Sequence, residues 1–405
     1  MNSDDPVHGA AEMAARQSYG KILAWLAWQW RDVCAAEDAL SEAFVSALKT
    51  WPRDGIPHSP EAWLLTAARR NLLMAARRKR LEDDPRVTVL FTDLLDGQKD
   101  DRAISDERLR LLFVCAHPAI DRSVHSALML QLVLGVDAAR IANAFLISPS
   151  ALSKRLTRAK AKIRDACIPF TEPEKMDLPN RIESVLEAIY GAYTINSAPD
   201  YEMGLADEAL FLAQLVSSQM PEDAEVLGLY ALLLFCESRK PARCNADGIF
   251  VPLYEQNHGL WRLELVLDAE SALAHAAQLK RPGPFQLEAA IQAVHMQCVL
   301  DGKARWREIL YLYERLLVLG PTIGAKIGHA IATAAEDPER GLARLDAIEP
   351  SRVATHQPWW AARANLLSTT GRHEEANAAY TRAIALTNDE SVQRWLKRRR
   401  TDSAE

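Results

Sequence analysis

Apolar side chains recur at intervals of three and four residues along almost the whole chain, and this spacing most constrains the fold. Such intervals place apolar groups on one face of an α-helix, whereas a half-buried strand needs strict alternation. The helical spacing is clear in 19–30, 36–50, 61–76, 106–116, 124–134 and 149–163. Alternating patterns and hairpin dipeptides are nearly absent. The sequence therefore predicts an all-α protein.

Breaks in the helical spacing divide the 405 residues into domains, of which two or three are expected at this length. Proline-rich and acidic stretches mark the breaks. We expect a first helical domain over residues 1–82, an acidic linker over 83–103 and a second helical domain over 104–168. A second linker, 169–180, leads to a larger C-terminal domain over 181–405.

Charge and composition narrow the possible partners. The net charge of −6 divides into +3 over residues 1–168 and −9 over the rest, so different partners are expected for the two parts. The acidic N-terminus is unlike a signal peptide, and the longest apolar run, Val226 to Cys236, is too short to span a membrane. Dispersed cysteines without a Cys-x-x-Cys pair fit a reducing cytosol. We expect a cytoplasmic protein with no membrane partner.

The first domain contains an acidic helix followed by a basic one. Residues 36–48 place apolar groups on one face and acidic groups on another. After the proline-rich loop 51–60, a second helix leads into residues 69–80, which hold six basic groups and no acidic one. Trp51 and Trp63 flank the loop. Aromatic rings beside cations suit melted DNA, and the alternative role for each ring, above all for Trp63, is core packing.

Residues 135–164 predict two helices joined by a tight turn. Asp137 is a plausible N-cap of the first helix, and Ser148, which precedes a proline, is a plausible N-cap of the second. The inward stripe of the second helix is formed by Leu152, Leu156, Ala159 and Ile163. Its outward side chains are small, polar or basic near the N-terminal end, which suits a helix that reads the DNA major groove.

Together these segments resemble the two-domain core of bacterial extracytoplasmic-function (ECF) sigma factors. The first domain is similar to sigma region 2 in Asp38-x-x-x-Glu42-Ala43-Phe44, Ala62-Trp63-Leu64 and Ala67-Ala68-Arg69-Arg70-Asn71. Residues 106–164 resemble sigma region 4. The resemblance implies a transcription initiation factor that binds core RNA polymerase through its clamp coiled coil and flap. It also implies that region 2 reads and melts the −10 promoter element and that region 4 reads the −35 element.

The resemblance assigns three sets of contact residues. The polymerase is expected to contact Glu37, Asp38, Leu40, Glu42 and Phe44. Promoter DNA at the −10 element, duplex and melted, is expected to contact Trp51, Arg53, Arg69, Arg70, Asn71, Arg77 and Arg78. Duplex DNA at the −35 element is expected to contact Ser150, Ser153, Lys154, Arg155 and Arg158.

The C-terminal domain resembles the tetratricopeptide-like extension of one ECF subgroup. The similar motifs lie in 109–120, 237–243 and 283–291. A tetratricopeptide helix pair is also indicated by the spacing of Trp360, Gly371, Ala376, Tyr380, Ala383 and Leu386. Stacked repeats offer a groove to a peptide, so we expect this domain to regulate the sigma core in cis or to bind a peptide partner. Residues 395–400, which end in four basic residues, are expected to form a solvated tail, with contact to DNA phosphates as the alternative.

No constellation in the sequence favours catalysis or a metal site. A phosphate-binding glycine-rich loop, Gly-x-Ser-x-Gly and metal-ligand spacing are all missing, so neither an enzyme nor a bound cofactor is expected. The alternative function is a stand-alone helix-turn-helix regulator with a ligand- or peptide-sensing repeat domain. It accounts for residues 135–164 but gives no role to the acidic helix or the Trp51 loop. The favoured hypothesis places the protein at the nucleoid.

Overall fold

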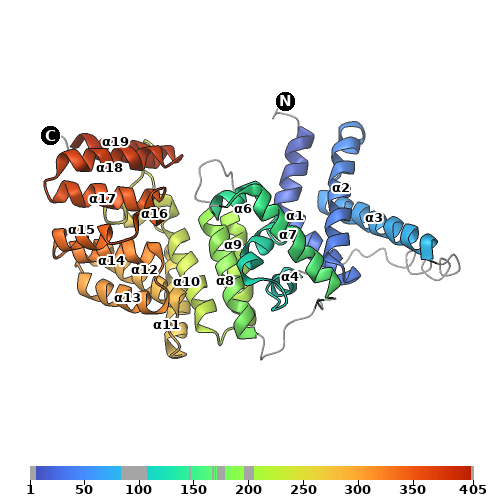
Figure 1. Cartoon of the computed structure of the whole chain (residues 1–405), viewed down its shortest axis with the longest axis horizontal. Helices are drawn as coiled ribbons and strands as arrows, with labels where there is room; N and C mark the ends of the chain where they lie inside the picture. Colours follow the sequence, from blue (N-terminus) through green and yellow to red (C-terminus); the bar gives the residue numbers. More distant parts are fainter. Residues whose placement is uncertain are drawn as a thin grey trace. The chain divides into compact units, whose positions relative to one another are not determined.

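The structure is a computed structural model, and it describes residues 6–83, 107–145, 147–166, 168, 170, 178–195 and 205–402. These residues form α-helices and three short 3₁₀ helices, with no strand beyond an isolated bridge between Cys244 and Phe250. The predicted all-α fold is confirmed. Most of each predicted linker lies outside the described residues. The chain divides into two compact units, and the boundary falls inside α9 (Leu205–Gln219), after Ala209 (Figure 1).

The first unit contains the two domains predicted for the first half of the chain, together with one further helix and the start of α9. Its helices are α1 (Pro6–Trp30), α2 (Val33–Asp54), α3 (Pro60–Asp83), α4 (Arg108–Cys115), α5 (Arg122–Leu132), α6 (Ala138–Ala144), α7 (Pro149–Asp165) and α8 (Leu178–Ile195).

The helices α1, α2 and α3 pack against one another. The Asp32 side chain caps α2 by accepting a hydrogen bond of 3.0 Å from the Ala35 amide, and α2 ends at Gly55, whose φ of 86° suits glycine. Fully buried side chains join the three helices, and they include Ile22, Leu23, Leu26, Leu40 and Leu64. This core fixes the direction in which the acidic face of α2 points.

Helix α4 packs against α1, α5 and α8, and all its residues except Leu109 and Arg110 are buried. Helix α8 lies in the first unit, whereas the predicted boundary assigns residues from 181 onward to the C-terminal domain. The reason is an apolar face of α8 that is buried in this unit, formed by Ile182, Val185, Leu186 and Ile189. His125 of α5 adds a polar contact, because its Nδ1 lies 3.1 Å from Ser184 Oγ of α8.

The second unit is a succession of helices in which neighbours along the chain pack together (Figure 1). After α9, its long helices are α10 (Ala224–Ser238), α11 (Leu263–Gln278), α12 (Pro284–Asp301), α13 (Trp306–Leu319), α14 (Ile323–Ala334), α17 (Gln357–Thr369), α18 (His373–Ala385) and α19 (Glu390–Asp402). Its shorter ones are η2 (Lys240–Ala242), η3 (Leu253–Glu255), η4 (His258–Leu260), α15 (Pro338–Asp346) and α16 (Pro350–Val353). The interpretation as tetratricopeptide repeats stays a prediction.

The longest apolar run of the sequence forms α10, a core helix packed against α11 and α12. Gly228 allows α12 to approach closely, because a Cβ at this position would lie only 2.5 Å from the Gln286 amide nitrogen. Between α10 and α11 the chain forms a loop that contains the three 3₁₀ helices.

The prediction of a solvated tail over residues 395–400 is right for Lys397 and Arg398, which are exposed, and wrong for the segment as a whole, which is part of a packed helix. Residues 390–402 form α19, in which Leu396 is fully buried. The Trp395 ring meets the Phe250 ring edge-on at 5.7 Å, and Arg399 forms an ion pair of 2.8 Å with Glu255. Both partners belong to the loop between α10 and α11, more than a hundred residues away in sequence, and such a partner is invisible in the local pattern.

We predict that the second unit loses stability in acid because of His295. Its Nδ1 lies 2.6 Å from Tyr254 Oη, and burial together with Arg239 lowers the His295 pKa from 6.5 to about 4. Between pH 6.5 and about 4, His295 is therefore protonated in the unfolded chain and neutral in the folded chain. As the pH falls through this interval, the free energy of unfolding decreases. The loss is up to about 3 kcal/mol.

Urea unfolding followed by circular dichroism at neutral pH and at about pH 4.5 checks this effect. A His295→Gln variant, which has no group that titrates there, is expected to lose about 2 kcal/mol less than the wild type across this interval. Equal losses in the two proteins contradict the assignment. The comparison is needed because burial also lowers the pKa values of His125, His329 and His356.

Candidate functional site

Helix α2 presents part of its acidic face to solvent. Asp38 and Glu42 are exposed, and Glu37 is half-buried. Phe44 is half-buried and stacks on Tyr19 of α1, with ring centroids 6.4 Å apart. Leu40 is fully buried in the core between the helices. Of the five residues expected to contact polymerase, Asp38 and Glu42 are therefore the most accessible, and Leu40 acts by holding the helix in place.

Four of the seven residues expected to contact the −10 element are exposed cations. They lie at the end of α2 and along α3, and they are Arg53, Arg70, Arg77 and Arg78. Arg69 is half-buried, and its guanidinium carbon lies 5.3 Å from the centre of the Trp25 ring. This cation–π contact orients Arg69 along the surface formed by α1 and α3.

Trp51 and Asn71 have structural contacts instead of exposed surfaces. Trp51 is 2% exposed and meets the Trp63 ring edge-on at 5.5 Å, so neither face of the Trp51 ring is open to a DNA base in this conformation. Asn71 Nδ2 donates a hydrogen bond of 3.1 Å to the Ala39 carbonyl oxygen and so ties α3 to α2. Of the two tryptophans that flank the loop, Trp63 is the more accessible.

The caps and the inward stripe predicted for residues 135–164 are confirmed. Asp137 Oδ1 accepts a hydrogen bond of 2.8 Å from the Ala139 amide at the start of α6. Ser148 Oγ accepts one of 3.3 Å from the Ala151 amide at the start of α7, where Pro149 is the first helical residue. The buried residues of α7 are Leu152, Leu156, Ala159 and Ile163.

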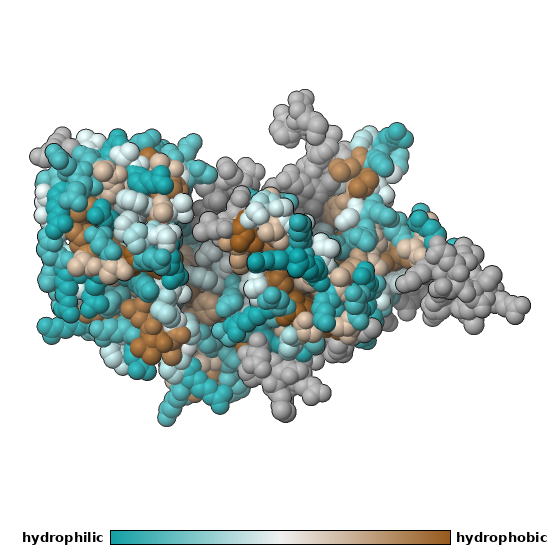
Figure 2. All heavy atoms as spheres, in the orientation of Figure 1, coloured by the Kyte–Doolittle hydropathy of each residue, from teal (hydrophilic) through white to brown (hydrophobic). Residues whose placement is uncertain are grey.

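The structure places all the residues expected to contact the −35 element in solvent on α7. They are Ser150, Ser153, Lys154, Arg155 and Arg158. Figure 2 shows hydrophilic side chains over this helix. Two hydroxyls and three cations near one helix end form a surface that can contact phosphates and base edges. The DNA contact itself stays a prediction.

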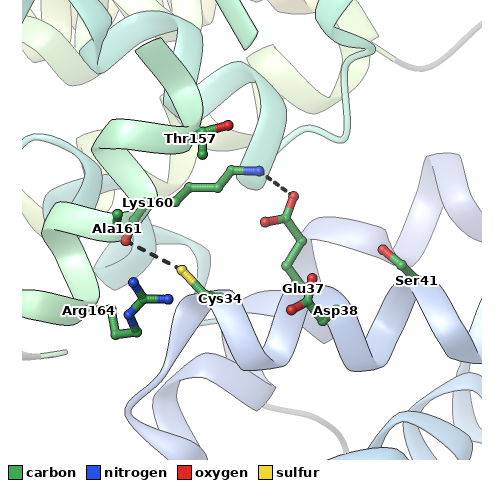
Figure 3. Close-up of a pocket in the computed structure, with 8 residues that line it drawn as sticks. All are labelled: Cys34, Glu37, Asp38, Ser41, Thr157, Lys160, Ala161 and Arg164. Carbon is green, nitrogen blue, oxygen red and sulfur yellow. Dashed lines mark hydrogen bonds and ion pairs between the residues drawn. The ribbon is translucent and has the colours of Figure 1, made fainter. Parts of the chain in front are cut away.

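The structure also shows a contact between α2 and α7 that the sequence pattern does not reveal (Figure 3). Lys160 Nζ of α7 forms an ion pair of 2.5 Å with Glu37 Oε1 of α2. The Cys34 thiol donates a hydrogen bond of 3.4 Å to the Lys160 carbonyl oxygen. A cavity of about 370 Å³ lies between the helices, lined by Cys34, Glu37, Asp38, Ser41, Thr157, Lys160, Ala161 and Arg164.

This cavity has the character of a polar interface and lacks the groups expected of a reactive centre. Burial is the main cause that raises the pKa of the Cys34 thiol, which therefore stays protonated at neutral pH. The described residues contain no group of three or more histidines, cysteines, aspartates or glutamates placed to hold a metal ion. In the same part of the chain, no helix has both the length and the apolar character needed to cross a membrane.

Comparison with known families gives two matches. Residues 16–82 match the model of "Sigma-70 region 2", which spans the C-terminal part of α1, all of α2 and all but the last residue of α3. Residues 181–277 match "Family of unknown function (DUF6596)". The chain is also 35% identical over 396 residues to an uncharacterised protein, R00370, of Rhizobium meliloti (strain 1021). The aligned part makes up 95% of this chain and 92% of the relative. No solved structure matches the chain.

We predict that Arg158 contributes a phosphate contact when α7 binds duplex DNA. An Arg158→Ala variant is expected to bind a nonspecific duplex more weakly, and the slope of log affinity against log salt is expected to be about 0.9 less steep. Fluorescence anisotropy over a salt series measures both quantities. Arg281→Ala removes an exposed arginine from the second unit and serves as the control. An unchanged slope for Arg158→Ala removes this residue from the DNA surface.

Proposed function

Because the chain is a sigma-70 family protein and belongs with the Rhizobium meliloti relative that it matches over nearly its whole length, we propose that it is a transcription initiation factor of the ECF type. It binds core RNA polymerase through the first three helices and directs the enzyme to promoters with −35 and −10 elements. Catalysis belongs to the polymerase, and this chain supplies recognition and strand opening in the cytoplasm, at the nucleoid.

The acidic face of α2 is the observation that carries this proposal. Asp38 and Glu42 are exposed on a helix whose other face is fixed by the fully buried Leu40. A rigid helix that presents carboxylates offers a docking surface for a partner with complementary charge. In sigma factors, which this domain resembles, that partner is the clamp coiled coil of the polymerase.

Promoter recognition follows from the basic surfaces of α3 and α7. Arg70, Arg77 and Arg78 would hold the DNA backbone near the −10 element, and Trp63 is the ring best placed to meet an unstacked base. The outward residues of α7 would read the −35 element as duplex. The C-terminal part of the chain, which carries a net charge of −9 beyond residue 168, would regulate this sigma core in cis or through a peptide partner, since it offers helix stacks.

The test is co-elution of the purified chain with sigma-free bacterial core polymerase. Glu42→Arg reverses an exposed charge on α2 and is expected to weaken binding at least about ten-fold, because like charges would then face each other. Glu270→Arg makes the same charge change at an exposed position of α11 and is expected to bind as the wild type does.

Two outcomes contradict the proposal. One is equal binding by the wild type and Glu42→Arg, which removes α2 from the interface. The other is no binding by the full chain or by any variant, combined with tight binding of duplex DNA. That combination favours the stand-alone regulator, which needs no polymerase.

A further inference from the structure

The ion pair between α2 and α7 lies on the face that the proposed function assigns to polymerase. Glu37 and Asp38 both line the cavity between these helices, and Glu37 is already paired with Lys160 (Figure 3). Both side chains of the pair are largely withdrawn from solvent, since Lys160 is 18% and Glu37 17% exposed. An α-helix with its side chains is about 10 Å across, so α7 leaves no room for a second helix on this part of α2.

A second contact fixes the same arrangement at a different place. Gly20 of α1 lies against the backbone of Val133, and a Cβ at Gly20 would clash with the Val133 carbonyl oxygen. The neighbouring Tyr19 ring lies beside Gly135, a glycine with φ of 63° that precedes α6. The absence of a side chain at Gly20 thus permits α1 to touch the segment that leads into α6 and α7.

Beside its buried apolar stripe, α7 has two further faces. Thr157, Lys160, Ala161 and Arg164 recur at intervals of three and four and line the cavity beside α2. The five residues expected to contact the −35 element remain in solvent. The contact with α2 therefore covers the part of the polymerase surface around Glu37, while it leaves the DNA-reading surface accessible.

We propose that the free protein is closed to polymerase, because α7 covers the end of the acidic face of α2 at Glu37 and leaves only Asp38 and Glu42 exposed, and that binding of core polymerase requires α7 to be displaced. This inference rests on the proposed function. This closure by α7 differs from regulation by the C-terminal domain, since α2 and α7 both belong to the first unit. The closed state binds duplex DNA and excludes polymerase, so the order of events in initiation would depend on release of α7.

The fraction of molecules in the open state determines how much closure weakens polymerase binding. When only a fraction of molecules is open, the apparent dissociation constant for polymerase exceeds the intrinsic one by the reciprocal of that fraction. A substitution that weakens closure without touching the polymerase surface must therefore tighten binding. The gain stops when most molecules are open.

Gly20→Ala is the sharpest such substitution. The three atoms nearest to its Cβ all belong to the Val133 backbone, and alanine is a better helix former than glycine, so α1 itself is not weakened. We expect the dissociation constant of the full chain for core polymerase to fall at least about ten-fold, while affinity for duplex DNA stays unchanged. Gly191→Ala is the control, because a Cβ there meets nothing within 4 Å.

Lys160→Ala tests the ion pair independently. This variant lacks the amine that pairs with Glu37, and Lys160 is assigned to neither the polymerase surface nor the DNA surface. The dissociation constant for polymerase is expected to fall about five-fold. Lys162→Ala removes an exposed lysine from the same helix and is expected to behave as the wild type does. Circular dichroism and thermal unfolding confirm that each variant is folded.

The outcomes separate this inference from the proposed function. Tighter binding by Gly20→Ala and Lys160→Ala, with both controls unchanged, supports the closed state. If the wild type binds polymerase and these two variants bind it equally or more weakly while folded, the closed state is overturned and the sigma function stands. If neither the wild type nor Gly20→Ala binds polymerase, the proposed function fails and this inference fails with it.

Discussion

The burial of the apolar stripe of α2 against α1 and α3 determines how the first unit presents its charges. Leu40 and Leu64 have no exposed surface, and the Asn71 side chain adds a hydrogen bond to the α2 backbone at Ala39. Since these contacts prevent α2 from rotating, Asp38 and Glu42 point outward together. A carboxylate surface of this kind is useful for recognition only when its helix is held rigidly.

The same unit shows how one helix serves two surfaces. A single stripe of α7 is apolar and buried, which leaves the rest of its circumference available for charged groups. Cations near the N-terminal end remain in solvent, whereas Lys160 meets Glu37 of α2. Because the loss of hydration offsets much of the attraction in a partly buried ion pair, such a contact is suited to an arrangement that a stronger partner can replace.

Several elements of the fold and the site could be predicted from local sequence. Helix caps depend on the residues next to them, so Asp137 and Ser148 could be identified without a structure. The inward stripe of α7 follows from helical periodicity for the same reason. Trp51 could not be resolved in this way, because a tryptophan beside a basic helix has the same local pattern whether its ring is buried or open. Its 2% exposure depends on the position of α3.

The amino-acid sequence by itself determined the helical class, the caps and the clustering of cations, since all of these arise between residues close along the chain. Tertiary structure alone decided which charged surfaces meet. Glu37 and Lys160 are separated by 123 positions, and the contact of Gly20 with Val133 is equally nonlocal. The packing of α8 with the first unit and of α19 against the loop of the second has the same origin. These choices depend on complementary shapes that form only once whole helices have packed, and no periodicity within a single segment encodes them.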